Sequence, residues 1–379
     1  MLDRSTPPPI KEVETLTFPE VDSCCLPNGI PLYIIDRGDQ ELSRVDILFS
    51  AGKVQERQPL TAKFTASMLR EGASDLSSAY IAEKLDYYGA TLQTLATQRN
   101  TYITLYSANR YFFDILPLLC KLVVSPDFPE EEFRTLKERN RQALSVDLMK
   151  VNVLASRIFS EQLFGAENPY GKSEQLADYD TLTTAHLREF HSRYYTAEQC
   201  RIVLSGRITP EMKAAVKETF AAVPSRSESE RFLFPAIHSS NEHYRFVEKA
   251  GALQAGIRVG RLVVGRDHPD HHILRVLNTV LGGYFGSRLM SNIREEKGYT
   301  YGIQSFNVSI PEGSYWCIAA DVNSDYTEAT IDETLKEIGK LQTEPIPEDE
   351  LTLVKNYFHG DLLREIDGVF SQSDALKHK

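Results

Sequence analysis

Alternating apolar and polar positions predict β-strands along the first part of the chain. In residues 44–49, Val45, Ile47 and Phe49 alternate with polar neighbours, as in a strand with one buried face. Other segments are rich in β-branched and aromatic residues and bounded by turn signals such as Pro27-Asn28-Gly29. These additional predicted strands are residues 30–36, 91–96, 101–107 and 200–205.

Helical periodicity and helix-start signals predict helices between these strands. Ser77 is a candidate N-cap, and Pro129 opens a long helix. Pro117 falls within another helical segment, where we expect it at a kink or in the first turn. The predicted helices are residues 60–69, 77–88, 111–124 and 129–149, a further stretch to Phe164, and one starting at Pro210.

The same order of elements recurs after a short, highly polar segment at 225–230 (Ser-Arg-Ser-Glu-Ser-Glu), which is typical of a linker. Beyond it we predict strands at 255–264, 301–308 and 315–321, and helices at 270–281, 287–296, 325–340 and from Pro347 onward. Both parts therefore read strand, two helices, two strands, two helices. This recurrence predicts an internal duplication near residue 235.

The duplication predicts two domains, residues 1–230 and 231–379, each with an α+β fold. We expect an antiparallel-rich sheet in each half, with helices packed mainly on one face. Residues 1–20 are Pro-rich and acidic and are predicted to form an extended arm. The first half continues to a strand at 200–205 and a closing helix, whereas the second stops at Lys379. By symmetry roughly 40–60 further residues are expected, so we expect the chain to be truncated at its C-terminus.

Composition is that of an ordinary globular chain: 379 residues, 42% hydrophobic and 25% charged, with a net charge of -11. The absence of a long basic block argues against a nucleic-acid or anionic-membrane partner. No apolar run approaches the ~18 residues of a membrane span, and no signal-peptide core is present. The five cysteines lack Cys-x-x-Cys spacing, and the adjacent Cys24 and Cys25 are interpreted as incidental or buried thiols. A reducing, cytoplasmic setting is expected.

The most informative segment is Leu-Gly-Gly-Tyr-Phe-Gly-Ser-Arg-Leu-Met-Ser-Asn-Ile-Arg-Glu-Glu-Lys-Gly-Tyr-Thr-Tyr at residues 281–301. Ser287 is a candidate cap for the helix that carries Arg294, Gly298 is its stop signal, and Tyr301 begins a strand. A helix end and the following strand can bring a guanidinium and a phenol to one point. Both are donors, suited to a carbonyl oxygen that gains negative charge during amide hydrolysis. The alternative is a solvated arginine and a tyrosine in the core or at its rim.

This segment, with His268-Pro-Asp-His-His272 before it, resembles the second-half signature of the pitrilysin/insulinase (M16) family of zinc peptidases. The resemblance implies that Arg294 and Tyr301 bind substrate. It also implies two homologous LuxS/metallohydrolase-like halves that enclose a chamber. Further matches extend the likeness over nearly the whole chain: Asn28-Gly29, the Asn-Pro-Tyr-Gly at 168–171, and residues 194–206.

The first-half signature of that family, His-x-x-Glu-His, is missing. A zinc peptidase site needs two imidazoles and a carboxylate as ligands, plus a general-base Glu. Residues 59–72 resemble the helix that carries this signature, but the ligand positions are Lys63 and Ser67 and the base position is Ala66. The third ligand should fall at 139–146, which contains no carboxylate. We therefore expect no metal in this chain and no hydrolysis by it alone.

One other cluster, Asp267-His268-Pro-Asp270-His271-His272, contains several potential metal ligands. On a helix, His268 and His272 would be i,i+4 neighbours. The alternative is that Asp267 or Asp270 caps the helix and the imidazoles are surface groups.

The resemblance also suggests a role, since some bacterial members are heterodimers in which one subunit carries zinc and the other supplies the Arg/Tyr pair. The first hypothesis is therefore a non-zinc subunit that binds peptide and acts in trans with a zinc-bearing M16 paralogue, the zinc lying in the partner. The second is a non-catalytic scaffold or peptide-binding protein, in which Arg294 is dispensable. A third, a self-sufficient zinc peptidase, predicts about one tightly bound zinc per chain.

Overall fold

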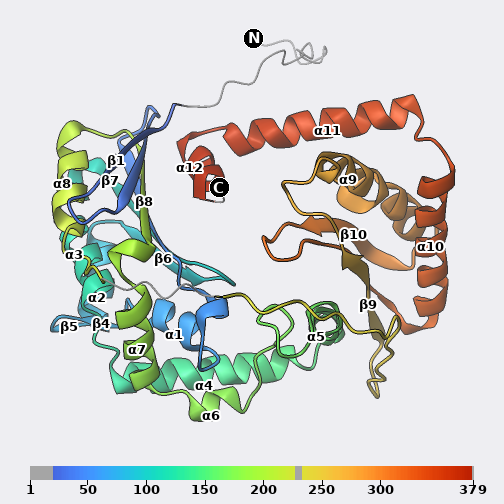
Figure 1. The fold of residues 1–379 in the computed structure, drawn as a ribbon, viewed down its shortest axis with the longest axis horizontal. Helices are drawn as coiled ribbons and strands as arrows, with labels where there is room; N and C mark the ends of the chain where they lie inside the picture. The colour runs from blue at the N-terminus through green and yellow to red at the C-terminus, as the bar shows by residue number, and fades with distance from the viewer. Residues whose placement is uncertain (1–19, 227–232, 378–379) are drawn as a thin grey trace, which may run out of the picture.

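The computed structural model describes residues 20–226 and 233–377. The predicted arm over residues 1–20 and most of the predicted linker at 225–230 lie outside the described residues. Within them the fold is α+β with antiparallel-rich sheets, as the sequence predicts (Figure 1).

The first half is built on a six-stranded sheet in the order β1-β2-β8-β3-β7-β6. Only β2 and β8 pair in parallel; the other neighbours are antiparallel. The central strand β3 is buried along nearly its whole length, so both of its faces are covered. The strands are β1 (Asp22–Cys25), β2 (Pro31–Asp36), β3 (Leu42–Phe49), β6 (Thr91–Ala96), β7 (Thr101–Ala108) and β8 (Cys200–Gly206), with a small hairpin of β4 (Gly72–Ala73) and β5 (Leu76–Ser77).

The helices of the first half follow the predicted helix-start signals closely. The Ser77 hydroxyl accepts the Tyr80 N–H at 3.3 Å, and Pro129 occupies the N-cap position of α4. Pro117 lies inside α3, beyond the first turn. The helices are α1 (Thr61–Met68), α2 (Ser78–Tyr87), α3 (Phe112–Val124), α4 (Glu130–Asp147), α5 (Val151–Phe164), α6 (Asp178–Thr181), α7 (Thr184–Tyr194) and α8 (Pro210–Phe220), with short 3-10 turns η1 (Lys53–Gln55), η2 (Asn109–Tyr111) and η3 (Ala197–Gln199).

The second half repeats part of this arrangement with an antiparallel sheet in the order β10-β11-β9. The order β3-β7-β6 in the first sheet corresponds to β9-β11-β10, so the predicted recurrence of elements is present. Whether residues 1–230 and 231–379 are separate domains stays a prediction. The elements are β9 (Gln254–Leu262), α9 (His271–Asn278), η4 (Thr279–Gly283), η5 (Met290–Glu296), β10 (Thr300–Val308), β11 (Tyr315–Asn323), η6 (Ser324–Tyr326), α10 (Thr327–Thr343), α11 (Glu348–Ile366) and α12 (Val369–Lys377).

Two helices of the second half differ from the prediction because η4 and η5 are π-helical. The Lys297 N–H bonds to the Asn292 carbonyl at 3.1 Å, an i→i−5 spacing that the 3.6-residue pattern does not reveal. The predicted Ser287 cap is wrong, since its buried hydroxyl has no hydrogen-bond partner among the described residues. The predicted helix stop at Gly298 is confirmed, with φ +66°.

Each half sends a helix onto the sheet of the other half. Helix α5 packs against β9 and β11, while α12 packs against β2 and β8 (Figure 1). The sequence predicts one long helix from Pro347 onward, but the structure has two. Helix α11 ends at Ile366, and the chain turns at Gly368 (φ +86°) before α12 begins. The turn lets α12 leave the axis of α11 and reach the first sheet.

A buried arginine holds α12 in place. Arg44 on β3 is 1% exposed and pairs with Asp46 on the same strand at 2.7 Å. Its guanidinium also donates to the Phe370 carbonyl at 2.9 Å and to the Asp374 carboxylate at 3.0 Å, both on α12. Lys377 at the end of α12 reaches back to Asp46 at 3.0 Å. We call these five residues the Arg44 cluster.

Arg258 on β9 provides the counterpart for α5. Its guanidinium donates to the Ser156 hydroxyl and to the Asn152 carbonyl of α5, each at 3.1 Å. It also pairs with Asp321 on β11 at 3.5 Å. Each sheet therefore binds the exchanged helix through an arginine on a strand.

The Arg44 cluster predicts a large loss of stability when the guanidinium is removed. Arg44→Met keeps the apolar stem but leaves Asp46 buried with one cation fewer, which should lower the free energy of unfolding by on the order of 3 kcal/mol. The matched control is Arg207→Met, which removes an exposed ion pair with Glu41 and should cost less than about 1 kcal/mol. Urea denaturation measures both; equal losses would contradict a stabilising role for the cluster.

Candidate functional site

Arg294 lies near the end of η5, and its guanidinium stacks on an aromatic ring. The guanidinium carbon is 4.6 Å from the centroid of Phe285, in the loop that joins η4 to η5. That loop is fixed by the neighbouring Tyr284, whose ring lies 5.3 Å from the ring of Tyr357 on α11. A Cβ at Gly286 would lie 2.9 Å from the Tyr284 ring, so glycine permits this turn.

Tyr301 is the second residue of β10, and its side chain is 94% exposed. Backbone hydrogen bonds join the start of this strand to the end of η5: the Gly298 N–H donates to the Arg294 carbonyl and the Tyr299 N–H to the Ile293 carbonyl. The segments that carry Arg294 and Tyr301 are therefore joined at one end of the second sheet.

Neither the Arg294 nor the Tyr301 side chain has a hydrogen bond or ion pair with any residue that the structure describes. Arg288, just before η5, is the opposite case, because Glu350 accepts its Nε–H at 2.8 Å and a terminal N–H at 2.7 Å. The guanidinium of Arg294 and the phenol of Tyr301 thus retain donors for an acceptor that is not part of the described chain.

The three positions of the missing zinc motif lie on α1 and are engaged locally. Lys63 forms an ion pair with Glu174 at 3.2 Å. The Ser67 hydroxyl donates to the carbonyl of Lys63 in its own helix at 2.9 Å, and Ala66 is buried. An ammonium and an alkyl group do not fit a dication, so these positions offer no zinc ligand set.

A partly buried carboxylate lies just before the start of α1. Glu56 accepts the Ala62 N–H at 2.7 Å and the Leu60 N–H at 3.1 Å. Burial raises the pKa of Glu56 to about 7, although these hydrogen bonds and the nearby Lys53 act in the opposite direction. Burial also lowers the pKa of Lys53. This titratable group was not found in the sequence, since an isolated Glu before a helix gives no signal of burial.

Residues 139–146, where a third ligand would fall, form part of α4. Leu144 packs in the same apolar cluster as Phe64 of α1. The Asn140 amide donates to the Leu136 carbonyl at 2.9 Å, within the helix. This stretch therefore contributes packing to α1 and no carboxylate.

The histidine cluster at 267–272 does not form the predicted i,i+4 pair. Helix α9 begins at His271, so His268 precedes it, and the His268 imidazole accepts the Asp270 N–H at 3.2 Å. Asp270 occupies the N-cap position, but its side chain makes no capping hydrogen bond. Among residues 20–226 and 233–377, no three His, Cys, Asp or Glu side chains are grouped to hold a metal.

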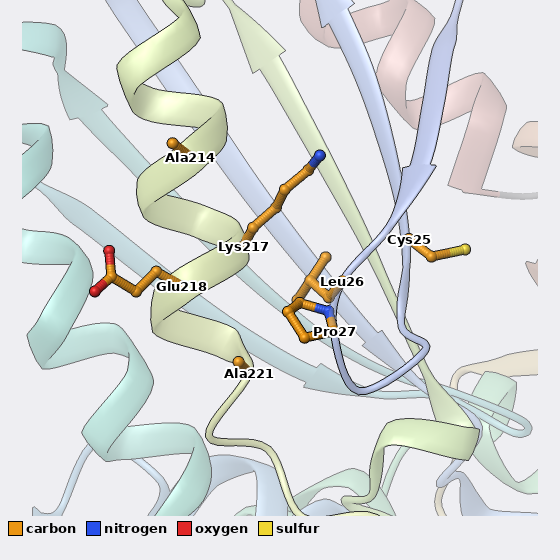
Figure 2. A pocket seen from close by; sticks show the side chains of 7 residues that line it. All are labelled: Cys25, Leu26, Pro27, Ala214, Lys217, Glu218 and Ala221. Carbon is orange, nitrogen blue, oxygen red and sulfur yellow. The ribbon is translucent and has the colours of Figure 1, made fainter.

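A depression of about 640 Å³ lies on the first half, between the β1–β2 turn and α8 (Figure 2). Its lining is mainly apolar, with Leu26 and Pro27 on one side and Ala214 and Ala221 on the other. Figure 2 shows the thiol of Cys25 pointing away from the helix. None of the predicted site residues lines it.

Comparisons with known proteins show which proteins this chain is similar to. The family described as peptidase M16 inactive domain matches residues 181–358. A Bacillus subtilis protein named uncharacterized zinc protease YmxG is 21% identical over 91% of this chain and 84% of its own length. The chain is therefore similar to proteins of the M16 peptidase family, and over residues 181–358 to their inactive domain. The Helicobacter pylori non-peptidase homolog YmxG is 23% identical to this chain over 66% of the chain and 59% of its own length.

A solved M16 inactive domain from Pseudomonas fluorescens has the same fold as this chain. It superposes with a TM-score of 0.81 at 22% identity and covers 92% of this chain and 86% of its own. This chain is thus M16-like, with the fold of an M16 inactive domain. None of its described helices combines the length and hydropathy needed to cross a bilayer.

The carboxyl group of Glu56 predicts a pH dependence of stability. Its pKa is about 7 in the folded chain, above the ordinary 4.5, so between these values the folded state retains a proton that the unfolded state has lost. Stability from this group is complete below pH 4.5 and falls as the pH rises to about 7. The urea midpoint of the wild-type chain should therefore drop more between pH 5 and 7.5 than that of Glu56→Gln.

Glu198→Gln is the control for this measurement. The pKa of Glu198 is lowered, since the raising effect of its slight burial is outweighed by hydrogen bonds such as that from the Arg226 N–H. Because the pKa of Glu198 is lowered and not raised toward 7, this variant should keep nearly the wild-type difference between the two pH values. A Glu56→Gln profile identical to wild type would contradict a raised pKa.

Proposed function

We propose that this chain is the non-zinc subunit of an M16 heterodimeric peptidase. In this proposal Arg294 and Tyr301 bind the peptide substrate in an active site whose zinc is held by a partner subunit. The observation that carries it is that both side chains keep unpaired donors in the described structure, at adjoining ends of η5 and β10.

The chemistry of these two groups suits the proposed role. During amide hydrolysis the scissile carbonyl oxygen gains negative charge, and pre-positioned donors stabilise it. The guanidinium of Arg294 is always charged and offers several N–H groups in one plane. The phenol of Tyr301 adds a neutral O–H donor. The positions Lys63, Ala66 and Ser67 can neither hold zinc nor act as a base, so the metal must come from another chain.

The proposed partner is therefore a zinc-bearing M16 paralogue, and the substrate a peptide. A cytoplasmic location belongs to the same proposal, and the five cysteines, all free thiols in the structure, are compatible with it.

The second candidate function is a scaffold or peptide-binding protein without a catalytic role. The name of the Helicobacter relative, non-peptidase homolog, favours it. The two candidates differ in one respect: a scaffold forms the same complex but does not need the donors of Arg294.

Arg294→Ala in the reconstituted complex separates these functions. The tagged chain is first used to isolate its zinc-bearing partner from native extract, and the two recombinant chains are then combined. Turnover of a fluorogenic casein peptide should fall by about 100-fold or more, because one oxyanion donor contributes that much. Size-exclusion chromatography should show unchanged assembly.

Arg110→Ala is the matched control, because Arg110 in the first half also stacks on an aromatic ring, that of Tyr111, at 4.6 Å. It should leave turnover unchanged. Activity that survives Arg294→Ala would exclude the trans-acting role and leave the scaffold function.

A further inference from the structure

The guanidinium of Arg294 stacks on the ring of Phe285. Among the described residues, this is its one aromatic or ionic contact. We propose that Phe285 is a positioning residue that holds the Arg294 guanidinium in the orientation needed to bind the substrate carbonyl. This inference rests on the proposed function. It acts through Arg294 and does not itself touch the reacting atoms.

The exposure of Phe285 argues against a role in the apolar core. Its side chain is 61% exposed, so the ring gains little from burial. The neighbouring Tyr284, by contrast, packs against Tyr357 and anchors the loop. The backbone therefore places the Phe285 ring at a defined position while leaving most of the ring open to solvent.

A ring holds an arginine without using its hydrogen-bond donors. Cation–π contact involves the face of the guanidinium, whereas the N–H groups point outward in its plane. A carboxylate in the same place would accept two of those N–H groups, as Glu350 does for Arg288. Carboxylates are close in sequence, at Glu295 and Glu296, yet neither is paired with Arg294 in the described structure.

The test is a set of substitutions at Phe285 in the reconstituted complex, with the casein peptide as substrate. Phe285→Leu keeps apolar volume but removes the π face, and should lower kcat by about threefold to tenfold with little change in KM. Phe285→Tyr keeps the ring and should retain turnover within about twofold. Phe285→Glu should pair with Arg294 and lower kcat further, toward the level of Arg294→Ala.

A double-mutant cycle distinguishes positioning from a structural role. In the Arg294→Ala background, Phe285→Leu should have no further effect on kcat, because the group that it orients is gone. The control Tyr111→Leu removes the other 4.6 Å stack and should not change kcat. Thermal unfolding midpoints of the Phe285 variants should match wild type.

The outcomes separate this inference from the function on which it rests. If Arg294→Ala abolishes turnover but Phe285→Leu does not lower it, the positioning role is wrong and the proposed function stands. The positioning role is also wrong, and the proposed function still stands, if Phe285→Leu lowers kcat equally with and without Arg294. If Arg294→Ala has no effect, both proposals are overturned.

Discussion

The relative position of the two sheets depends on the exchange of helices between the halves. A guanidinium that is buried has to be paired, since an uncompensated charge in the interior costs several kcal/mol. Asp46 on the same strand pairs with Arg44, and α12 supplies further acceptors at Phe370 and Asp374 when it lies on the first sheet. Arg258 binds α5 on the second sheet. Polar contacts of this kind specify one arrangement of helix on sheet, whereas apolar packing alone would tolerate small shifts. The segment around Arg294 is therefore attached to a well-defined frame.

Arg44 and Arg294 show how the same side chain serves two purposes. Arg44 is enclosed by carboxylates, a carbonyl and aromatic rings, so its bonding capacity is used within the chain. Arg294 contacts a ring and keeps its N–H groups unpaired. Full pairing is typical of a group that stabilises the fold, whereas an unpaired guanidinium keeps its donors for another acceptor. The substrate-binding role proposed for Arg294 requires this difference, and the sequence motif is what distinguishes Arg294 from other stacked arginines such as Arg110.

Much of the fold was predictable because its signals are local. The strand at Thr91–Ala96 follows from the alternation of residue types along it. The cap at Ser77 follows from a single hydroxyl before the helix. The π-helices were not predictable from the sequence, since they depend on close packing with other elements. A Cβ at Gly282, for example, would lie 2.7 Å from Ser305 of β10. The turn at Gly368 had a local signal, but nothing local indicated that α12 crosses to the other sheet. Phe285 was missed because its contact with Arg294 spans a turn and follows no helical or strand period.

The loss of the zinc motif without loss of the fold also has a physical explanation. Helix α1 is held by its apolar face, on which Phe64 packs against Phe133 and Tyr179 with ring centroids about 6 Å apart. Met68 is fully buried in the same cluster. A catalytic metal adds chemistry to an already folded site, unlike a structural zinc, on which folding itself depends. Lys63 and Ser67 lie on the polar side of this helix, where an ion pair and a local hydrogen bond satisfy them. The helix therefore persists as part of the core without the metal-binding side chains.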